Sequence, residues 1–182
     1  MTAFAKLLEA ALFAATRPIA EADLARLEPG AGPDRVRAAL AELRAHYDDP
    51  EAGHAVELVE QGGGWQLLTR PEYAEAIERA QIADRPQRLS AAALETLAVI
   101  AYRQPIGRAD VEEIRGVAVG GVLKTLLERG LVDVVGRAEG LGRPLLYGTT
   151  PRFLEQFALR HLDELPRADE LAVALRANPA AL

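Results

Sequence analysis

The sequence contains no cysteine and only 5% aromatic residues, and each shortage removes a class of chemistry. Without cysteine the chain forms no disulfide bond, thiolate metal site or cysteine nucleophile, which is compatible with a reducing compartment. The few aromatics fall mostly on predicted helix stripes and hairpins, so they leave no platform for stacking nucleic-acid bases. The longest uninterrupted apolar runs, 10–15 and 97–102, have six residues, so neither a signal peptide nor a membrane-spanning helix is predicted.

An excess of positive charge is also missing. The 182 residues carry 21 Lys and Arg against 27 Asp and Glu, a formal net charge of −6, which does not suit a protein that coats nucleic acid. Residues 1–85 hold 9 basic and 15 acidic side chains, whereas residues 86–182 hold 12 of each, so an anionic partner would prefer the second half. With 49% hydrophobic and 26% charged residues, the composition indicates a soluble globular protein of one large or two small domains.

The residue patterns of an active site are absent from the sequence. Ser90 is the single serine and lacks the Gly-x-Ser-x-Gly surroundings of a nucleophile, and there is no phosphate-binding loop. His46, His54 and His161 are too far apart to pair on a helix. The acidic loop between His46 and His54 leaves a weak cation site as the less favoured alternative to a solvated loop. We therefore predict a protein that is not an enzyme, with no catalytic, cofactor-binding or metal-binding residues.

An internal repeat decides between one domain and two. Six residues near the start recur 87 positions later, and five residues of a second block recur 80 positions later. The first block is Pro18, Ile19, Ala22, Asp23, Leu24 and Leu27, matched by Pro105, Ile106, Ala109, Asp110, Val111 and Ile114. The second block is Leu67, Thr69, Pro71, Tyr73 and Ile77, matched by Tyr147, Thr149, Pro151, Phe153 and Phe157. Two blocks in the same order indicate a duplicated unit.

The first copy is predicted to form three helices, a hairpin and a closing helix. A second helix opens near Glu21, a third covers residues 36–47, and alternating residues around the glycine turn 61–64 are typical of a β-hairpin. The closing helix begins near Pro71. The first helix is indicated by an apolar stripe of Phe4, Leu7, Leu8, Ala11, Leu12 and Ala15.

The second copy repeats this order. Ser90 is the predicted N-cap of the first helix, Gly116 ends the second helix 108–115, and Gly130 ends the third helix 119–127. Strands 131–137 and 145–147 flank a glycine loop, and Thr150 caps a closing helix with Pro151 at its first position.

Three helices followed by a β-hairpin are typical of a winged-helix domain. The predicted fold is therefore α+β, mainly α: tandem winged-helix domains, each with three helices, a β-hairpin wing and a closing helix. We place the first domain at residues 1–82, a linker at 83–88, the second domain at 89–162 and a mobile tail at 163–182.

A winged helix most often binds DNA, so a winged-helix DNA-binding transcription regulator is the alternative function. However, the third helix of the second copy begins with the apolar and glycine residues 117–121 and has no base-reading side chain before Lys124. Besides Lys124, only Arg137 and Arg143 of the second wing resemble phosphate contacts. We therefore predict weak DNA contact through these three residues at most.

The apolar start of the third helix in the second copy is predicted to lie beside a loop that has the composition of a protein-binding surface. The alternative is that Tyr102 and Ile106 only pack between helices. The loop consists of Tyr102, Arg103, Gln104, Pro105 and Ile106.

Residues 94–106 read Leu-Glu-Thr-Leu-Ala-Val-Ile-Ala-Tyr-Arg-Gln-Pro-Ile, which resembles the most recognisable segment of the bacterial segregation and condensation protein B family. Residues 112–117, 123–131 and 142–150 extend the resemblance over most of 89–150, while the first domain matches mainly in layout. One departure is the start of the third helix of the second domain. The family commonly has polar residues there and this chain has Val119, Gly120 and Gly121, so polar contacts cannot be carried over.

The resemblance implies a non-enzymatic accessory subunit that dimerises through its amino-terminal domain and binds the kleisin, segregation and condensation protein A. The kleisin in turn bridges the ATPase heads of a structural-maintenance-of-chromosomes (SMC) protein, in a cytoplasmic, nucleoid-associated complex that compacts and partitions the chromosome. The resemblance adds Arg115 to the predicted kleisin-binding residues Tyr102, Arg103, Gln104, Pro105 and Ile106.

Overall fold

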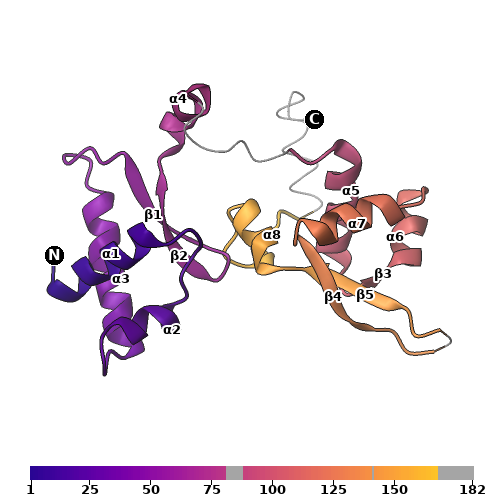
Figure 1. Ribbon diagram of the computed structural model, residues 1–182, viewed down its shortest axis with the longest axis horizontal. Coiled ribbons are helices and arrows are strands. Elements are labelled where there is room, and N and C mark those ends of the chain that lie inside the picture. The colour runs from indigo at the N-terminus through magenta and orange to yellow at the C-terminus, as the bar shows by residue number, and fades with distance from the viewer. Residues whose placement is uncertain (81–87, 141, 168–182) are drawn as a thin grey trace.

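The computed structural model describes residues 1–80, 88–140 and 142–167 (Figure 1). Nearly all of the predicted linker, and residues 168–182 of the predicted tail, therefore lie outside the described residues. The described chain forms two groups of elements, each with its own hydrophobic core. This arrangement confirms the predicted tandem winged-helix fold.

The first domain contains the helices and the hairpin that the sequence predicts. The first helix, α1, ends where the chain turns toward Pro18, and the third helix, α3, has Pro33 at its first turn. A 3-10 turn at Ala25–Leu27 extends α2, and another at Pro71–Tyr73 precedes α4. The elements are α1 (Ala3–Ala14), α2 (Glu21–Leu24), α3 (Pro33–Tyr47), β1 (Val56–Gln61), β2 (Gly64–Thr69) and α4 (Ala74–Arg79).

The second domain repeats this order and adds a short strand. That strand, β3, pairs with β5 through Ile106 and Tyr147, so the sheet has the order β3-β5-β4. The first domain has the corresponding contact as an isolated bridge between Ile19 and Trp65, as expected for a duplicated unit. The elements are α5 (Ala91–Arg103), β3 (Ile106–Gly107), α6 (Arg108–Arg115), α7 (Gly120–Glu128), β4 (Val132–Arg137), β5 (Leu145–Thr149) and α8 (Pro151–Gln156).

Local signals define the helix ends of the second domain. The Ser90 hydroxyl accepts a hydrogen bond from the Ala93 amide at 3.2 Å, and the Thr150 hydroxyl accepts one from the Phe153 amide at 3.3 Å. Gly116 ends α6 with a φ of +67°, a left-handed conformation that a side chain would disfavour. These three predicted helix signals are confirmed.

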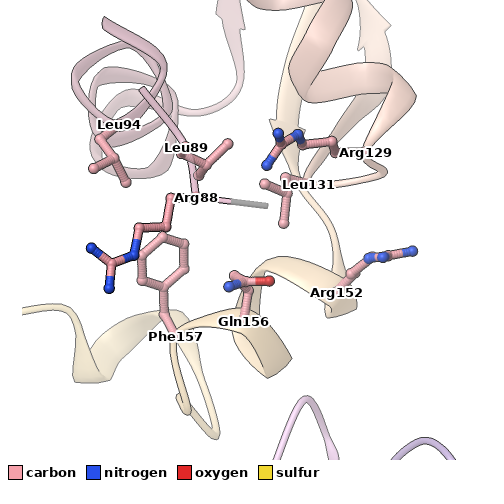
Figure 2. A pocket seen from close by; sticks show the side chains of 8 residues that line it. All are labelled: Arg88, Leu89, Leu94, Arg129, Leu131, Arg152, Gln156 and Phe157. Atoms are coloured by element: carbon pink, nitrogen blue, oxygen red, sulfur yellow. The ribbon is translucent and has the colours of Figure 1, made fainter. Parts of the chain in front are cut away.

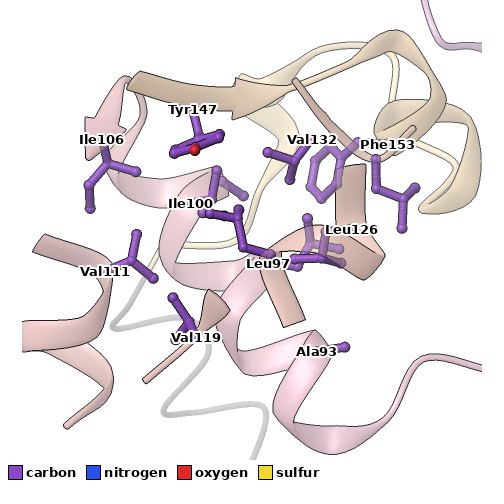
Figure 3. Packing of buried hydrophobic residues seen from close by; sticks show 13 residues of the cluster. Ala93, Leu97, Ile100, Ile106, Val111, Val119, Leu126, Val132, Tyr147 and Phe153 are labelled. Atoms are coloured by element: carbon purple, nitrogen blue, oxygen red, sulfur yellow. The ribbon is translucent and has the colours of Figure 1, made fainter. Parts of the chain in front are cut away.

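Figure 3 shows the core of the second domain, where α5 packs between the other helices and the sheet. Leu97 and Ile100 of α5, Val111 of α6 and Leu126 of α7 are fully buried. Their helical spacing puts each on the inner face of its helix, which is why burial follows the predicted stripes.

The predicted stripe of α1 is partly wrong. Phe4, Leu8 and Leu12 are buried, but Leu7 is exposed and Ala15 lies just beyond the end of the helix. Ala5 is buried instead, on the side of α1 that packs in the first core.

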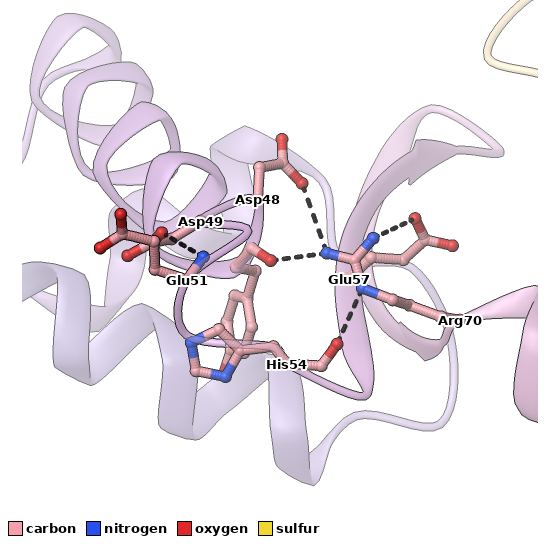
Figure 4. Close-up of polar contacts among 7 residues, drawn as sticks. Asp48, Asp49, Glu51, His54, Glu57 and Arg70 are labelled. Atoms are coloured by element: carbon pink, nitrogen blue, oxygen red, sulfur yellow. Dashed lines mark hydrogen bonds and ion pairs between the residues drawn. The ribbon is translucent and has the colours of Figure 1, made fainter.

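His46 and His54 do not pair on one helix, as predicted, because His46 lies on α3 and His54 in the loop that follows it, but the fold brings the two rings together. The chain reverses after α3, so the ring centroids of His46 and His54 lie 4.5 Å apart. The acidic loop between them serves to hold Arg70, which donates to the carbonyl oxygens of Tyr47 at 2.6 Å and His54 at 2.8 Å (Figure 4). Among the described residues, no three His, Asp or Glu side chains converge as metal ligands would.

Candidate partner-binding surface

The predicted partner-binding residues lie where α5 ends and β3 begins. Tyr102 and Arg103 form the last turn of α5, and Gln104 is its C-cap, with its amide donating to the Ile100 carbonyl at 2.9 Å. A cis peptide bond joins Gln104 to Pro105. The chain then enters the sheet at Ile106, so the five sequential positions 102–106 lead from the surface end of the helix to the core.

The Gln104 side chain ties the end of α5 to the far end of the hairpin. Its carbonyl oxygen accepts from the Thr149 amide at 2.8 Å, and its amide nitrogen donates to the Ala101 carbonyl at 3.0 Å. Gly148 lies against the same side chain: a Cβ at this position would come within 2.9 Å of the Gln104 oxygen. Gln104 therefore positions the loop and has little capacity left for a partner.

Ile106 and Arg115 also make their contacts within the domain. Ile106 is only 6% exposed and belongs to the core, as the packing alternative predicted for it. The Arg115 guanidinium donates to the Glu95 carboxylate at 2.7 Å and to the Thr96 hydroxyl at 3.4 Å, with 14% of its side chain exposed. Arg115 thus fastens α6 to α5.

Three of the six predicted residues remain at the surface. Tyr102 is 45% exposed, and Arg103 and Pro105 are exposed as well. The Tyr102 hydroxyl donates to the carbonyl oxygen of Pro166, where the described chain passes back over the end of α5. An aromatic ring, a planar cation and a proline thus form one compact surface on a loop that Gln104 holds in place.

The residues predicted for weak DNA contact lie on two elements. Lys124 lies on α7, where its ammonium group is 3.7 Å from the Glu128 carboxylate, so part of its charge is neutralised. Arg137 ends β4 and donates across the wing to the carbonyl oxygen of Arg143 at 3.3 Å. Both arginines are exposed. The two wing residues are brought together, while Lys124 belongs to the helix and already has an ion-pair partner.

The glycine-rich start of α7 has a physical explanation. Gly120 leaves room for the Arg108 guanidinium, since a Cβ would lie 3.0 Å from its nearest nitrogen. Arg108 in turn donates to Glu112 at 2.9 Å, and the same carboxylate oxygen accepts from the Val119 amide at 3.0 Å. The start of α7 is therefore covered by α6, and these two hydrogen bonds lower the pKa of the Glu112 carboxyl, Arg108 having the larger effect.

We predict that Glu112→Gln lowers the melting temperature at pH 7. Folding lowers the pKa of the Glu112 carboxyl below its ordinary value of 4.5. The ionised carboxylate therefore stabilises the fold at pH values above 4.5. This stabilisation decreases as the pH falls below 4.5 and through the lower folded-state pKa, so the difference between the two melting temperatures should be smaller at about pH 3 than at pH 7. Thermal unfolding at both pH values measures this, with the adjacent exposed Glu113→Gln as the control. A difference that is equal at both pH values would contradict it.

Sequence reasoning missed a hollow of about 490 Å³ on the second domain (Figure 2). Three arginines from distant positions surround it: Arg88 before α5, Arg129 after α7 and Arg152 on α8. Its other lining residues are Leu89, Leu94, Leu131, Gln156 and Phe157. Nothing in the sequence indicates that positions 88, 129 and 152 meet, because only the packing of α8 against α5 and α7 brings them together.

The fold defines a tandem winged-helix protein whose second domain presents an aromatic and cationic surface at the end of α5. The chain belongs to the family of the segregation and condensation complex subunit ScpB, whose sequence profile matches residues 6–168. This confirms the resemblance detected in residues 94–150. No helix among the described residues is long and apolar enough to cross a membrane.

Two relatives named segregation and condensation protein B agree with this assignment. The chain is 51% identical over 164 residues to segregation and condensation protein B of Syntrophotalea carbinolica, covering 90% of this chain and 81% of the relative. It is 49% identical over 167 residues to the protein of that name from Moorella thermoacetica, covering 92% and 84%. The crystal structure of ScpB from Mycobacterium tuberculosis is 34% identical and covers 85% of this chain and 94% of that chain, with a TM-score of 0.39.

Proposed function

We propose that this chain is a non-enzymatic accessory subunit of a bacterial condensin-like SMC–kleisin complex and acts in chromosome condensation and partition during cell division. The observation that carries the proposal is the family match over residues 6–168, together with relatives named for segregation and condensation. The ATP chemistry of such a complex would reside on the SMC partner. The chain would be cytoplasmic and nucleoid-associated.

The kleisin is the proposed direct partner, and the SMC heads would be reached through it. We assign kleisin binding to the second domain, residues 89–162, with Tyr102, Arg103 and Pro105 in contact and Gln104, Ile106 and Arg115 positioning them. The exposure of the first three and the internal contacts of the other three support this division. Dimerisation is assigned to the first domain, residues 1–82.

Affinity purification of the full-length chain from its native cytoplasm tests this function. The expected result is co-purification of a kleisin and an SMC ATPase, identified by mass spectrometry. Recovery of neither, together with enrichment of one specific operator sequence, would support the transcription-regulator alternative instead.

The proposed dimer predicts that Phe13→Ser lowers self-association. Phe13 is 84% exposed on α1, and Leu7 of the same helix is exposed as well, so apolar surface is available for a second copy. Light scattering of the full-length protein across micromolar concentrations should show a mass above one chain for the wild type and a shift toward one chain for the variant. Lys6→Ser, at another exposed position of α1, is the matched control. A wild-type mass of one chain throughout this range would contradict the dimer.

DNA binding is predicted to be weak and independent of sequence. The net charge is −6, and Lys124, one of only three candidate contacts, is already paired with Glu128. Few phosphate contacts release few counterions, so binding should vanish by about 0.2 M salt. Fluorescence anisotropy with duplexes of unrelated sequence measures this, and Arg137→Ala should weaken all of them equally. Nanomolar binding to one sequence at that salt concentration would overturn the adaptor function.

A further inference from the structure

The closing helix of the first domain, α4, packs only weakly within the described part of the chain. None of the residues of α4 is buried, and only Ile77 is partly covered, whereas its repeat counterpart α8 buries Phe153 in the core. In Figure 1, α4 stands apart from the helices of both domains. A six-residue helix has little stability by itself in water, so a helix that buries nothing is expected to find its packing elsewhere.

The α4 segment combines acidic and apolar side chains. Residues 71–79 carry Glu72, Glu75 and Glu78 beside Tyr73, which is 40% exposed, and Ile77. Arg79 partly offsets this charge through its ion pair with Glu75 at 3.9 Å. The segment therefore presents an exposed aromatic ring within a run of acidic residues.

The arginine hollow of the second domain is apolar and basic, and so complements the aromatic and acidic α4 segment. Its apolar wall includes Leu94 and Phe157, which are 44% and 40% exposed, and its rim carries Arg88, Arg129 and Arg152. Among the described residues no carboxylate lines it, whereas three other hollows of similar size on this acidic protein each include at least one. An aromatic ring fits the apolar wall, and carboxylates around the ring fit the arginines.

We propose that α4 of one copy docks in the arginine hollow of a second copy. Tyr73 would pack against Leu94 and Phe157, while Glu72, Glu75 and Glu78 face the arginines of the rim. The contact joins two different surfaces, α4 on one copy and the hollow on the other. In a dimer with two-fold symmetry, each copy would insert its α4 into the hollow of its partner, so the contact would occur twice. This inference goes beyond the proposed function and requires neither kleisin nor DNA.

The structure favours a second copy over the same chain as the source of α4. Arg70 anchors the segment before α4 to the first domain through the carbonyl oxygens of Tyr47 and His54. The tip of the first wing is fixed to the second domain, because the Gly62 amide donates to the Leu159 carbonyl at 2.9 Å. With these contacts in place, α4 stands away from α5 and α8, which carry the hollow (Figure 1).

Thiol cross-linking tests the contact cleanly because the chain has no native cysteine. Two single-cysteine full-length proteins, Ala76→Cys on α4 and Gln156→Cys at the hollow, are mixed and treated with a short bismaleimide. Both positions are exposed, so both variants should fold. We expect a mixed cross-linked dimer whose yield falls at least fivefold when Arg152→Glu is added to the Gln156→Cys chain. Arg137→Glu, at an exposed arginine of the wing, should leave the yield unchanged.

Two results would overturn the proposal. One is a low yield of the mixed dimer. If Ala76→Cys gives no more cross-linked product with Gln156→Cys than with Gly140→Cys, whose thiol lies on the second wing, the contact is not specific to the hollow. The other is an intramolecular product: a chain carrying both Ala76→Cys and Gln156→Cys that cross-links within itself at low concentration would show that α4 docks in its own hollow. Adding Phe13→Ser to both proteins separates this contact from the proposed dimer of the first domain, because the mixed product should persist.

Discussion

Leu97→Ala is expected to destabilise the second domain by about 3 kcal/mol and to leave the first domain intact. Leu97 is 1% exposed at the centre of the second core, so truncation removes buried apolar contacts and leaves a cavity. The first domain has a separate core that contains Trp65, the single tryptophan of the chain. Far-UV circular dichroism should therefore show an early partial transition, while Trp65 fluorescence changes at the wild-type temperature.

Leu94→Ala is the matched control for this substitution, because Leu94 lies on the same helix but is 44% exposed. Its effect on stability should remain below about 1 kcal/mol. If Leu97→Ala shifts the Trp65 transition as far as the circular dichroism transition, the two domains unfold as one unit. The wing contact between Gly62 and Leu159 would then couple the two cores more strongly than their separation indicates.

Tyr102→Ala is expected to weaken kleisin binding about thirtyfold, equivalent to ~2 kcal/mol, if the residue is the anchor of the interface. The aromatic ring is 45% exposed, so its removal should change the melting temperature little. Isothermal titration calorimetry with the purified kleisin measures the affinity, and thermal unfolding of the same samples measures stability.

Tyr147→Ala is the control for a core substitution that affects stability. Tyr147 is buried beneath the same loop and pairs with β3. Its truncation should cost stability through the core, by roughly 3 kcal/mol. A Tyr102→Ala protein that melts early but binds the kleisin with unchanged affinity when folded would refute the interface and favour the packing alternative. Lost affinity at an unchanged melting temperature would refute the packing alternative.

The sequence by itself determined the helices, the two hairpins and their order, whereas the short strand β3 appeared only in the structure. Caps such as Ser90 and Thr150 and the glycine end of α6 act within one helical turn, so local chemistry is enough to predict them. The duplication predicted two similar domains because equivalent residues recur in the same order. Apolar periodicity indicated the buried face of α5, where Leu97 and Ile100 lie in the core.

Tertiary structure alone decided what each surface does. Gln104, Ile106 and Arg115 belong to the predicted binding set together with Tyr102. Their contacts to Thr149, Tyr147 and Glu95 nevertheless turn these three side chains inward. The arginine hollow depends on helices that meet only after folding, and the meeting of His46 with His54 depends on a chain reversal. Periodicity specifies which side of a helix is apolar, but the partner that covers it is set by long-range packing. The two closing helices illustrate this, because α8 buries Phe153 in the core whereas its repeat counterpart α4 buries no residue.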